Sequence, residues 1–229
     1  MPDGRWVMRQ RWEDLLFAHW PVPPEALRPL IPHPLEIETW DGAAWLGIVP
    51  FRLAGLRFRR GPLVPRVHSF VELNVRTYVT NGERSGVWFL SLDASSRAAV
   101  LGARQTYRLP YHLARMATAE RGGWIEFRHE RVGGGFAFEA RYRPVAEAAV
   151  ASPSSLECFL AERYLLYAAD RRGRLFSADI RHRPWPLQPA EAEIEVDGVG
   201  IELCGDPHLR FSRSIDVLIW PLRRTSLSA

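Results

Sequence analysis

The chain has 229 residues, of which 47% are apolar and 24% are charged. This size and balance fit one globular domain, and no apolar run is long enough to span a membrane as a helix. Its two cysteines, Cys158 and Cys204, argue against a disulfide-rich secreted scaffold. We therefore expect a single domain over residues 1–229, without a membrane anchor and located in the cytoplasm.

The basic residues are unusual because the 30 lysine and arginine residues are all arginine. They are spread along the chain among 26 acidic residues, which leaves a net charge of only +4. This mixture is typical of a solvated surface and argues against a nucleic-acid-binding stripe. Without lysine there is no side-chain amine to form a Schiff base, so covalent catalysis of that type is excluded.

Short strands separated by turn signals dominate the first part of the chain. Asp41-Gly42 and Asn81-Gly82 are typical of tight hairpin turns. Pro23-Pro24 predicts the start of a short helix, because proline suits a first helical turn. The predicted strands cover residues 14–22, 35–40, 43–53, 70–79 and 87–92.

Two further helices are predicted. The first is capped by Asp93 or Ser95 and stopped by Pro110. The second begins at a capping box formed by Ser154 and Glu157, and its apolar stripe continues to Tyr167. The later strand predictions are a hairpin over 124–143 with a tip at 133–135, and strands at 175–183, 192–196 and 210–220. No strand–helix alternation is present, which favours a mostly antiparallel sandwich or closed barrel with two or three attached helices.

The strand at 70–79 has two different faces because side chains alternate along a strand. One face is aliphatic. In antiparallel sheets a polar face most often meets water, and the pattern by itself favours this arrangement. In a closed barrel the same face instead enters the lumen, where pockets combine aromatic walls with a few polar groups. The residues of this mixed face are Phe70, Glu72, Asn74, Arg76 and Tyr78.

Other candidate residues carry titratable or aromatic side chains near the predicted ends of helices and strands. Each type is more often found on the surface or in the core than in a site. They are Arg104, Tyr107, Tyr111, His112, His182 and Trp185. The seven histidines never pair at metal-binding spacings, so no metal is expected. Motifs for a serine nucleophile, a phosphate loop or a dinucleotide are also absent, and no cofactor is predicted.

Several sequence runs resemble the YqjF-like family, a conserved bacterial family of unknown function (DUF2071). The resemblance extends over nearly the whole chain. The runs are PHPLEIETWDGAAWLGIVPF, FVELNVRTYV, SLDASSRAAVLGARQTYRLPYHLARM, LAERYLLY and HRPWPL. That family is similar in turn to the acetoacetate decarboxylase superfamily, whose fold is a β-barrel with a central pocket. The resemblance therefore implies an α+β, mainly β chain, built as an antiparallel β-barrel of the acetoacetate-decarboxylase-like type.

The superfamily's motifs can be compared with this chain residue by residue. Its aromatic-x-Glu motif is similar to 70–72 and implies an active-site glutamate at Glu72. Its Gly-Arg-Glu segment resembles 102–104 imperfectly, because Ala103 intrudes and Gln105 replaces the acid. Its Pro-Lys-Lys segment resembles 110–112, so the catalytic lysine falls on Tyr111, which cannot form an imine. The resemblance thus implies the barrel and its pocket, but not the decarboxylase mechanism.

We therefore predict a small-molecule pocket lined by Glu72, Arg76, Arg104, Tyr111 and His112. Its arginines suit a small carboxylate or oxo-acid, because the guanidinium fork matches that geometry. The remaining predicted substrate-binding residues are Tyr107, His182 and Trp185. The alternative is a non-covalent lyase, isomerase or hydrolase with Glu72 or His112 as general base and Tyr111 as general acid. No nucleic-acid or membrane partner is predicted, and the sequence gives no oligomeric state.

Overall fold

The computed structural model describes residues 2–65 and 67–225, which form one 13-stranded sheet with a few short helices. The strands are β1 (Met8–Val22), β2 (Glu36–Ile37), β3 (Ala44–Phe58), β4 (Phe70–Thr80), β5 (Ser85–Ala94), β6 (Tyr111–Arg121), β7 (Trp124–Arg131), β8 (Ala137–Pro144), β9 (Leu165–Ala169), β10 (Leu175–Arg181), β11 (Gln188–Asp197), β12 (His208–Ile219) and β13 (Arg223–Arg224). The helices are α1 (Pro24–Leu27), the 3-10 helix η1 (Arg28–Leu30), α2 (Arg97–Thr106) and α3 (Leu156–Ala161). No helix in this part of the chain is long and apolar enough to cross a bilayer.

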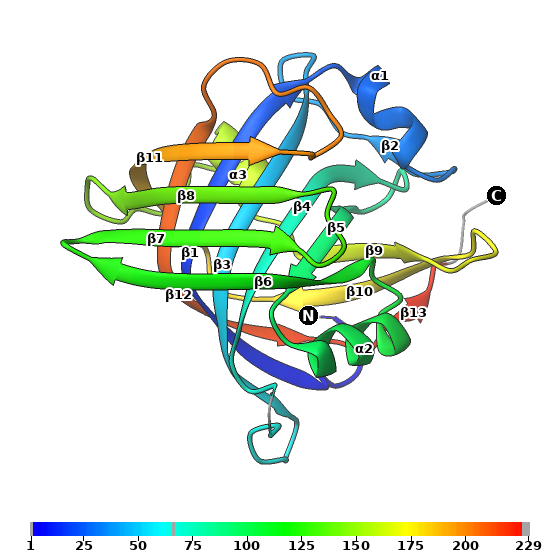
Figure 1. The fold of residues 1–229 in the computed structure, drawn as a ribbon. Coiled ribbons are helices and arrows are strands. Elements are labelled where there is room, and N and C mark those ends of the chain that lie inside the picture. The colour runs from blue at the N-terminus through cyan, green and yellow to red at the C-terminus, as the bar shows by residue number, and fades with distance from the viewer. Residues whose placement is uncertain (1, 66, 226–229) are drawn as a thin grey trace.

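The strands close into a barrel. One ring runs β12–β1–β3–β4–β5–β9–β10 and returns to β12. A second path leaves β5 through β6, β7, β8 and β11 and also returns to β12. In Figure 1 this second group of strands crosses in front of β1, β3 and β4, so these three strands are covered on that side.

The central strands therefore bury both of their faces. On β1, Leu16 and Ala18 belong to an apolar core that also contains Phe127 and Phe138 of the covering layer. Leu15 and Phe17 belong to a different core inside the barrel ring. The same alternation continues on β4, where the aliphatic face packs towards the covering layer and the opposite face lies inside the barrel. Burial on both sides explains why these strands are rich in large apolar residues.

An irregularity in β1 changes which of its side chains face the interior. The pairing of β1 with β3 shifts register between Glu13 and Ala18, and Asp14 in this stretch has a positive φ of 56°. Even-numbered residues such as Trp12 line the interior before this point, and odd-numbered residues such as Leu15 line it afterwards. A bulge adds one residue to one strand of a pair, so it reverses the alternation and bends the strand around the barrel.

Most predicted strands and turns are confirmed. Asp41 and Gly42 both have positive φ, and Trp40 pairs with Ala43 across them as expected for this turn. Glycines 133–135 form the tip between β7 and β8. The strand at 35–40 shortens to β2, whereas the strand predicted from residue 14 begins at Met8. The barrel is mixed rather than purely antiparallel as predicted, because β5 pairs in parallel with both β6 and β9.

The helix predictions need correction. The caps of α2 and α3 are Ser96 and Ser155, whose hydroxyls accept hydrogen bonds from Ala99 N and Cys158 N, so both caps differ from those predicted. The predicted helix from 154 to 167 ends at Ala161, and its second half is the strand β9. β9 pairs with β5 and β10 inside the barrel wall, and this pairing overrides the helical spacing of its apolar residues.

Candidate functional site

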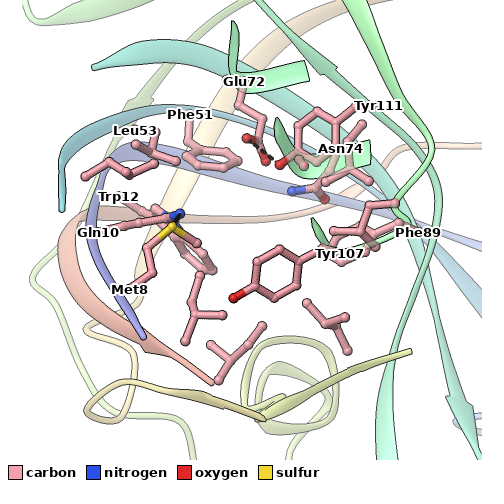
Figure 2. A pocket seen from close by; sticks show the side chains of 18 of the residues that line it. Met8, Gln10, Trp12, Phe51, Leu53, Glu72, Asn74, Phe89, Tyr107 and Tyr111 are labelled. Carbon is pink, nitrogen blue, oxygen red and sulfur yellow. Dashed lines mark hydrogen bonds between the residues drawn. The ribbon is translucent and has the colours of Figure 1, made fainter. Parts of the chain in front are cut away.

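The interior of the barrel ring contains a cavity of about 550 Å³. Its walls are mostly apolar and aromatic, and they come from β1, β3, β4, β5 and β10, with α2 at one end. Figure 2 shows the side chains that converge on it, including Trp12, Phe51 and Phe89. A cavity of this size and composition, with a few polar groups, is typical of a small-molecule site.

The mixed face of β4 supplies the polar groups. Glu72, Asn74 and Arg76 all line the cavity, and each is at least nine-tenths buried. They point the same way because they are two residues apart on one strand. Of the two arrangements that the sequence allows, the structure therefore has the lumen-facing one; the expectation that this face meets water is wrong.

Glu72 is paired with Tyr111 at the start of β6. The Tyr111 hydroxyl donates a hydrogen bond of 2.9 Å to Oε2 of Glu72 (Figure 2). Burial raises the pKa of Glu72 to about 8; the Tyr111 hydrogen bond lowers it and the charge of Asp93 raises it. The pKa of Tyr111 lies well above its ordinary value because the hydroxyl is buried and its partner is an acid. At neutral pH the carboxyl group of Glu72 therefore carries its proton, and the pair presents neutral hydrogen-bonding groups.

Arg76 is the most distinctive group of the cavity. It is only 8% exposed, and no carboxylate among the described residues forms an ion pair with it. Its Nη2 donates a long hydrogen bond of 3.5 Å to Leu160 O, and its Nε is buried with no partner in the part of the chain that the structure describes. The guanidinium carbon lies 5.4 Å from the ring centre of Phe17 and 5.8 Å from that of Tyr78. Burial of a cation without an anionic partner is costly.

A second arginine of the cavity, Arg163, differs in this respect. Its Nη1 lies 2.6 Å from Oε2 of Glu38, and its Nε donates to Phe159 O. Glu38 therefore balances its charge, and Arg76 supplies the surplus positive charge of the cavity. Since Glu72 is neutral at pH 7, the lining carries one unbalanced positive charge, which a single bound anion would neutralise.

Two residues that line the cavity also carry buried polar atoms without a partner among the described residues. Oδ1 of Asn74 and Nε1 of Trp185 are buried and have no hydrogen-bond partner in the structure. Buried polar atoms of folded proteins are almost always paired. One acceptor and one donor on the wall of the cavity are exceptions and have no partner among the described residues.

Three more predicted residues line the cavity. Tyr107 does so from the end of α2, and its hydroxyl donates to Trp220 O at 3.2 Å. His182 donates from Nδ1 to Arg183 O at 2.7 Å, and burial lowers its pKa, which favours the neutral ring. Trp185 lies beside His182 and packs edge-on against Phe17, with ring centres 4.9 Å apart.

Arg104 and His112 do not line the cavity, which corrects the predicted arrangement. Arg104 is exposed, and its Nε donates to the backbone carbonyl of Tyr111, joining α2 to β6 from outside. His112 follows Tyr111 on β6 and so points to the other side of the strand. There it lies near Asp93 and Arg131, and burial with the Arg131 charge lowers its pKa. Of the predicted site residues Arg104, Tyr111 and His112, only Tyr111 therefore lines the cavity.

Some lining residues were not predicted from the sequence. Gln10 and Trp12 lie on β1 before the predicted strand start, and Trp12 Nε1 donates to Gln10 Oε1 at 2.7 Å. The alternation of Met8, Gln10 and Trp12 was the available signal. The helix predicted over residues 154–167 includes Arg163, whereas α3 ends at Ala161.

Comparison with known families agrees with the resemblance seen in the sequence. The model of the DUF2071 family, described as an uncharacterised conserved protein, matches residues 9–212. The chain belongs to this family. The uncharacterised protein YqjF of Bacillus subtilis (strain 168) is 47% identical over 232 residues, which cover 99% of this chain and 96% of YqjF.

Several solved structures have a similar fold. The enduracididine biosynthesis enzyme MppR, complexed with the condensation product of pyruvate and imidazole 4-carboxaldehyde, gives a TM-score of 0.71 at 12% identity, covering 99% of this chain and 92% of that one. Acetoacetate decarboxylase from Legionella pneumophila gives 0.70 at 11% identity, with coverages of 99% and 92%. An acetoacetate decarboxylase-like enzyme from Sphingomonas wittichii RW1 gives 0.68 at 14% identity, with coverages of 98% and 95%. These similarities establish the acetoacetate-decarboxylase-like fold of the chain.

Proposed function

We propose that this protein binds a small carboxylate or oxo-acid inside the barrel, with Arg76 as the group that holds the carboxylate. The observation that carries the proposal is the burial of Arg76 beside the cavity without an ion-pair partner among the described residues. A bound carboxylate supplies the missing negative charge and accepts two parallel hydrogen bonds from the guanidinium group.

The surroundings of Arg76 support an anionic ligand. The acid of the cavity, Glu72, is neutral at pH 7 and does not repel a carboxylate. Asn74 and Trp185, which line the cavity, carry a buried acceptor and a buried donor without a partner among the described residues. MppR, which shares the fold, has been solved complexed with pyruvate, a 2-oxo-acid.

The chemistry of the site differs from that of a Schiff-base enzyme. No lysine occurs anywhere in the chain, so no side-chain amine is available to attack a carbonyl group. Tyr111 occupies the position that the superfamily's motif assigns to lysine, and its hydroxyl is engaged with Glu72. The proposed site therefore recognises its ligand through charge and hydrogen bonds.

The test is a titration of the protein with pyruvate and butanoate, and with the matched neutral amide butanamide, followed by calorimetry. Wild-type protein should bind the acids and not the amide. Arg76→Gln should weaken acid binding at least tenfold, while Arg76→Lys, which keeps the charge, should retain part of it. The matched control is Arg115→Gln, which removes the same charge from a side chain that is 76% exposed. Equal binding of acid and amide, or unchanged binding by Arg76→Gln, contradicts the proposal.

A second candidate is a non-covalent acid–base enzyme centred on Glu72 and Tyr111. The observation in its favour is the raised pKa of Glu72, which brings a carboxyl group close to neutrality beside a cavity. His112, the other predicted base, is excluded from direct contact by its position outside the cavity. The test is exchange of the C3 protons of 2-oxobutanoate with deuterated water, measured by NMR. Enzyme-dependent exchange that Glu72→Gln abolishes supports catalysis, and exchange at the background rate argues for binding alone.

A further inference from the structure

The cavity is much larger than a short acid requires. Its volume of about 550 Å³ equals roughly 18 water volumes at ~30 Å³ each. An acid of three or four carbons fills only a small part of such a space. Since pockets of ~300–1,000 Å³ typically enclose most of the surface of a drug-sized ligand, the size of the cavity indicates a longer molecule.

The spacing of the polar groups leads to the same conclusion. Glu72 and Arg76 lie on one face of β4, four residues apart, so their Cα atoms are separated by ~13 Å. The Arg76 guanidinium group lies over the ring of Tyr78, which is further along β4 from Glu72, and donates to Leu160 O of α3. A three-carbon acid held by Arg76 is therefore too short to reach the Glu72–Tyr111 pair.

The opposite end of the cavity is apolar and open. The face of α2 that lines it carries only small side chains, and a Cβ atom built on Gly102 meets nothing within 4 Å. These residues are Ala98, Ala99, Gly102, Ala103 and Thr106. Leu56, Val64 and Leu222 also line the cavity and belong to the same apolar cluster as Ala99 and Ala103. Phe58 lines the cavity and is 56% exposed, which marks the opening to solvent.

The deep end and the open end are well separated. Arg76 contacts Leu160 of α3, whereas α2 packs against β5 and β6. In Figure 1 the two helices lie at different ends of the barrel strands. The cavity thus presents, in order, a cation, a pair of neutral hydrogen-bonding groups and an apolar space next to α2.

From this order we propose that the ligand is an elongated monocarboxylic acid with an apolar body. This inference rests on the proposed function and specifies its ligand class. The carboxylate binds Arg76, an oxygen atom along the molecule meets Glu72 and Tyr111 when the ligand has one there, and the apolar body packs against the small side chains of α2. Burial of the apolar body provides most of the discrimination, because the hydrophobic contribution grows with the area removed from water.

The experiment measures the affinity of wild-type protein for butanoate, hexanoate, octanoate and decanoate by calorimetry, below their micelle-forming concentrations. Affinity should rise by about fourfold per buried methylene group. Ala103→Leu fills the space next to α2 and should weaken octanoate binding at least tenfold more than butanoate binding. The matched control is Gln105→Leu, which adds the same side chain to an exposed position that does not line the cavity.

The possible outcomes separate this inference from the proposed function. If all four acids bind with similar affinity and Arg76→Gln still removes binding, the elongated ligand is refuted while the carboxylate site stands. If none of the acids binds, both proposals fail. If Ala103→Leu and Gln105→Leu weaken octanoate equally, the apolar body does not lie against α2 and the inference is again overturned.

Discussion

The hydroxyl of Tyr111 lies 2.9 Å from Oε2 of Glu72, although 39 residues separate the two in the chain. β6 brings Tyr111 next to β5, and β5 pairs with β4, which carries Glu72. The contact therefore depends on a parallel pairing that follows α2. It places a weakly acidic carboxyl group and a phenol inside an apolar barrel, where neither ionises readily.

The first prediction concerns stability as a function of pH. The folded protein keeps the Glu72 proton up to about pH 8, whereas the unfolded chain releases it near the ordinary value of 4.5. Between these values the folded state binds more protons, so the free energy of unfolding should fall as pH rises, by up to ~1.4 kcal/mol per pH unit. Glu72→Gln should remove this slope in urea denaturation at pH 5, 6.5 and 8. Glu193→Gln, at a side chain 70% exposed, is the control; the same slope in the wild-type protein and Glu72→Gln would contradict the prediction.

The second prediction concerns ligand affinity as a function of pH. Above about pH 8 the carboxyl group of Glu72 ionises and adds a negative charge to the cavity that holds Arg76. Carboxylate affinity should therefore be constant from pH 6 to 7.5 and fall at higher pH. Calorimetric titration with octanoate at pH 6.5, 7.5 and 9 checks this. Glu72→Gln should lose the fall, and a decrease of equal size in both proteins would show that another group causes it.

The third prediction concerns the ion pair between β5 and β7. Arg131 holds the fully buried Asp93 through Nε and Nη2, at 2.8 and 2.7 Å. Burial raises the pKa of Asp93, but the hydrogen bonds and charges of Arg131 and His129 outweigh it and keep the pKa below its ordinary value. Arg131→Gln leaves a buried carboxylate without its main partner and should destabilise the protein by ~3–5 kcal/mol.

The control for this ion pair is Arg128→Gln. Arg128 faces Glu139 on the outer layer, where the two side chains are 73% and 61% exposed. Its loss should change stability by less than ~1 kcal/mol, because exposed ion pairs contribute little. Similar destabilisation by the two variants in urea denaturation at pH 7 would be inconsistent with the buried position of Asp93.

The fourth prediction concerns the packing of β9 against β5. A Cβ atom on Gly86 would lie 2.8 Å from the ring of Tyr167 and 2.9 Å from Leu165 O. Gly86→Ala should therefore destabilise the protein by ~1–3 kcal/mol, since overpacking forces the neighbours to move. Gly102→Ala meets open space in a helix and should stabilise it by up to ~1 kcal/mol. Thermal unfolding of both variants checks the pair; a Gly86→Ala protein as stable as wild type would contradict the close approach.

The success of the sequence predictions depended on local chemistry. Asp41-Gly42 forms its turn because both residues tolerate positive φ, a preference that belongs to the residues themselves. The alternation on β4 also follows from the strand alone. By contrast, Leu165–Ala169 continues an apolar pattern that is compatible with a helix or a strand. The segment is a strand because it pairs with β5 and β10.

The errors in the predicted site have a common cause, which is the direction in which each side chain points. Regular alternation would put Trp12 and Leu15 on opposite faces of the strand. A bulge near Asp14 reverses the alternation, so both side chains face the interior of the barrel. Arg104 and His112 were assigned to the pocket through motif positions, but the first binds a backbone carbonyl and the second points away from the cavity. Short motifs specify residue order, not the direction of each side chain in a folded barrel.

The sequence by itself determined that Schiff-base chemistry is impossible, since no lysine is present, and that one face of β4 carries Glu72, Asn74 and Arg76 together. Only the tertiary structure decided that this face lies inside the barrel rather than in water, and that Glu38 balances Arg163 but leaves Arg76 without an ion-pair partner among the described residues. The physical reason is that the burial and charge balance of a side chain depend on strands brought together by long-range pairing. Local preferences fix which residues share a face, and the closure of the barrel fixes what that face meets.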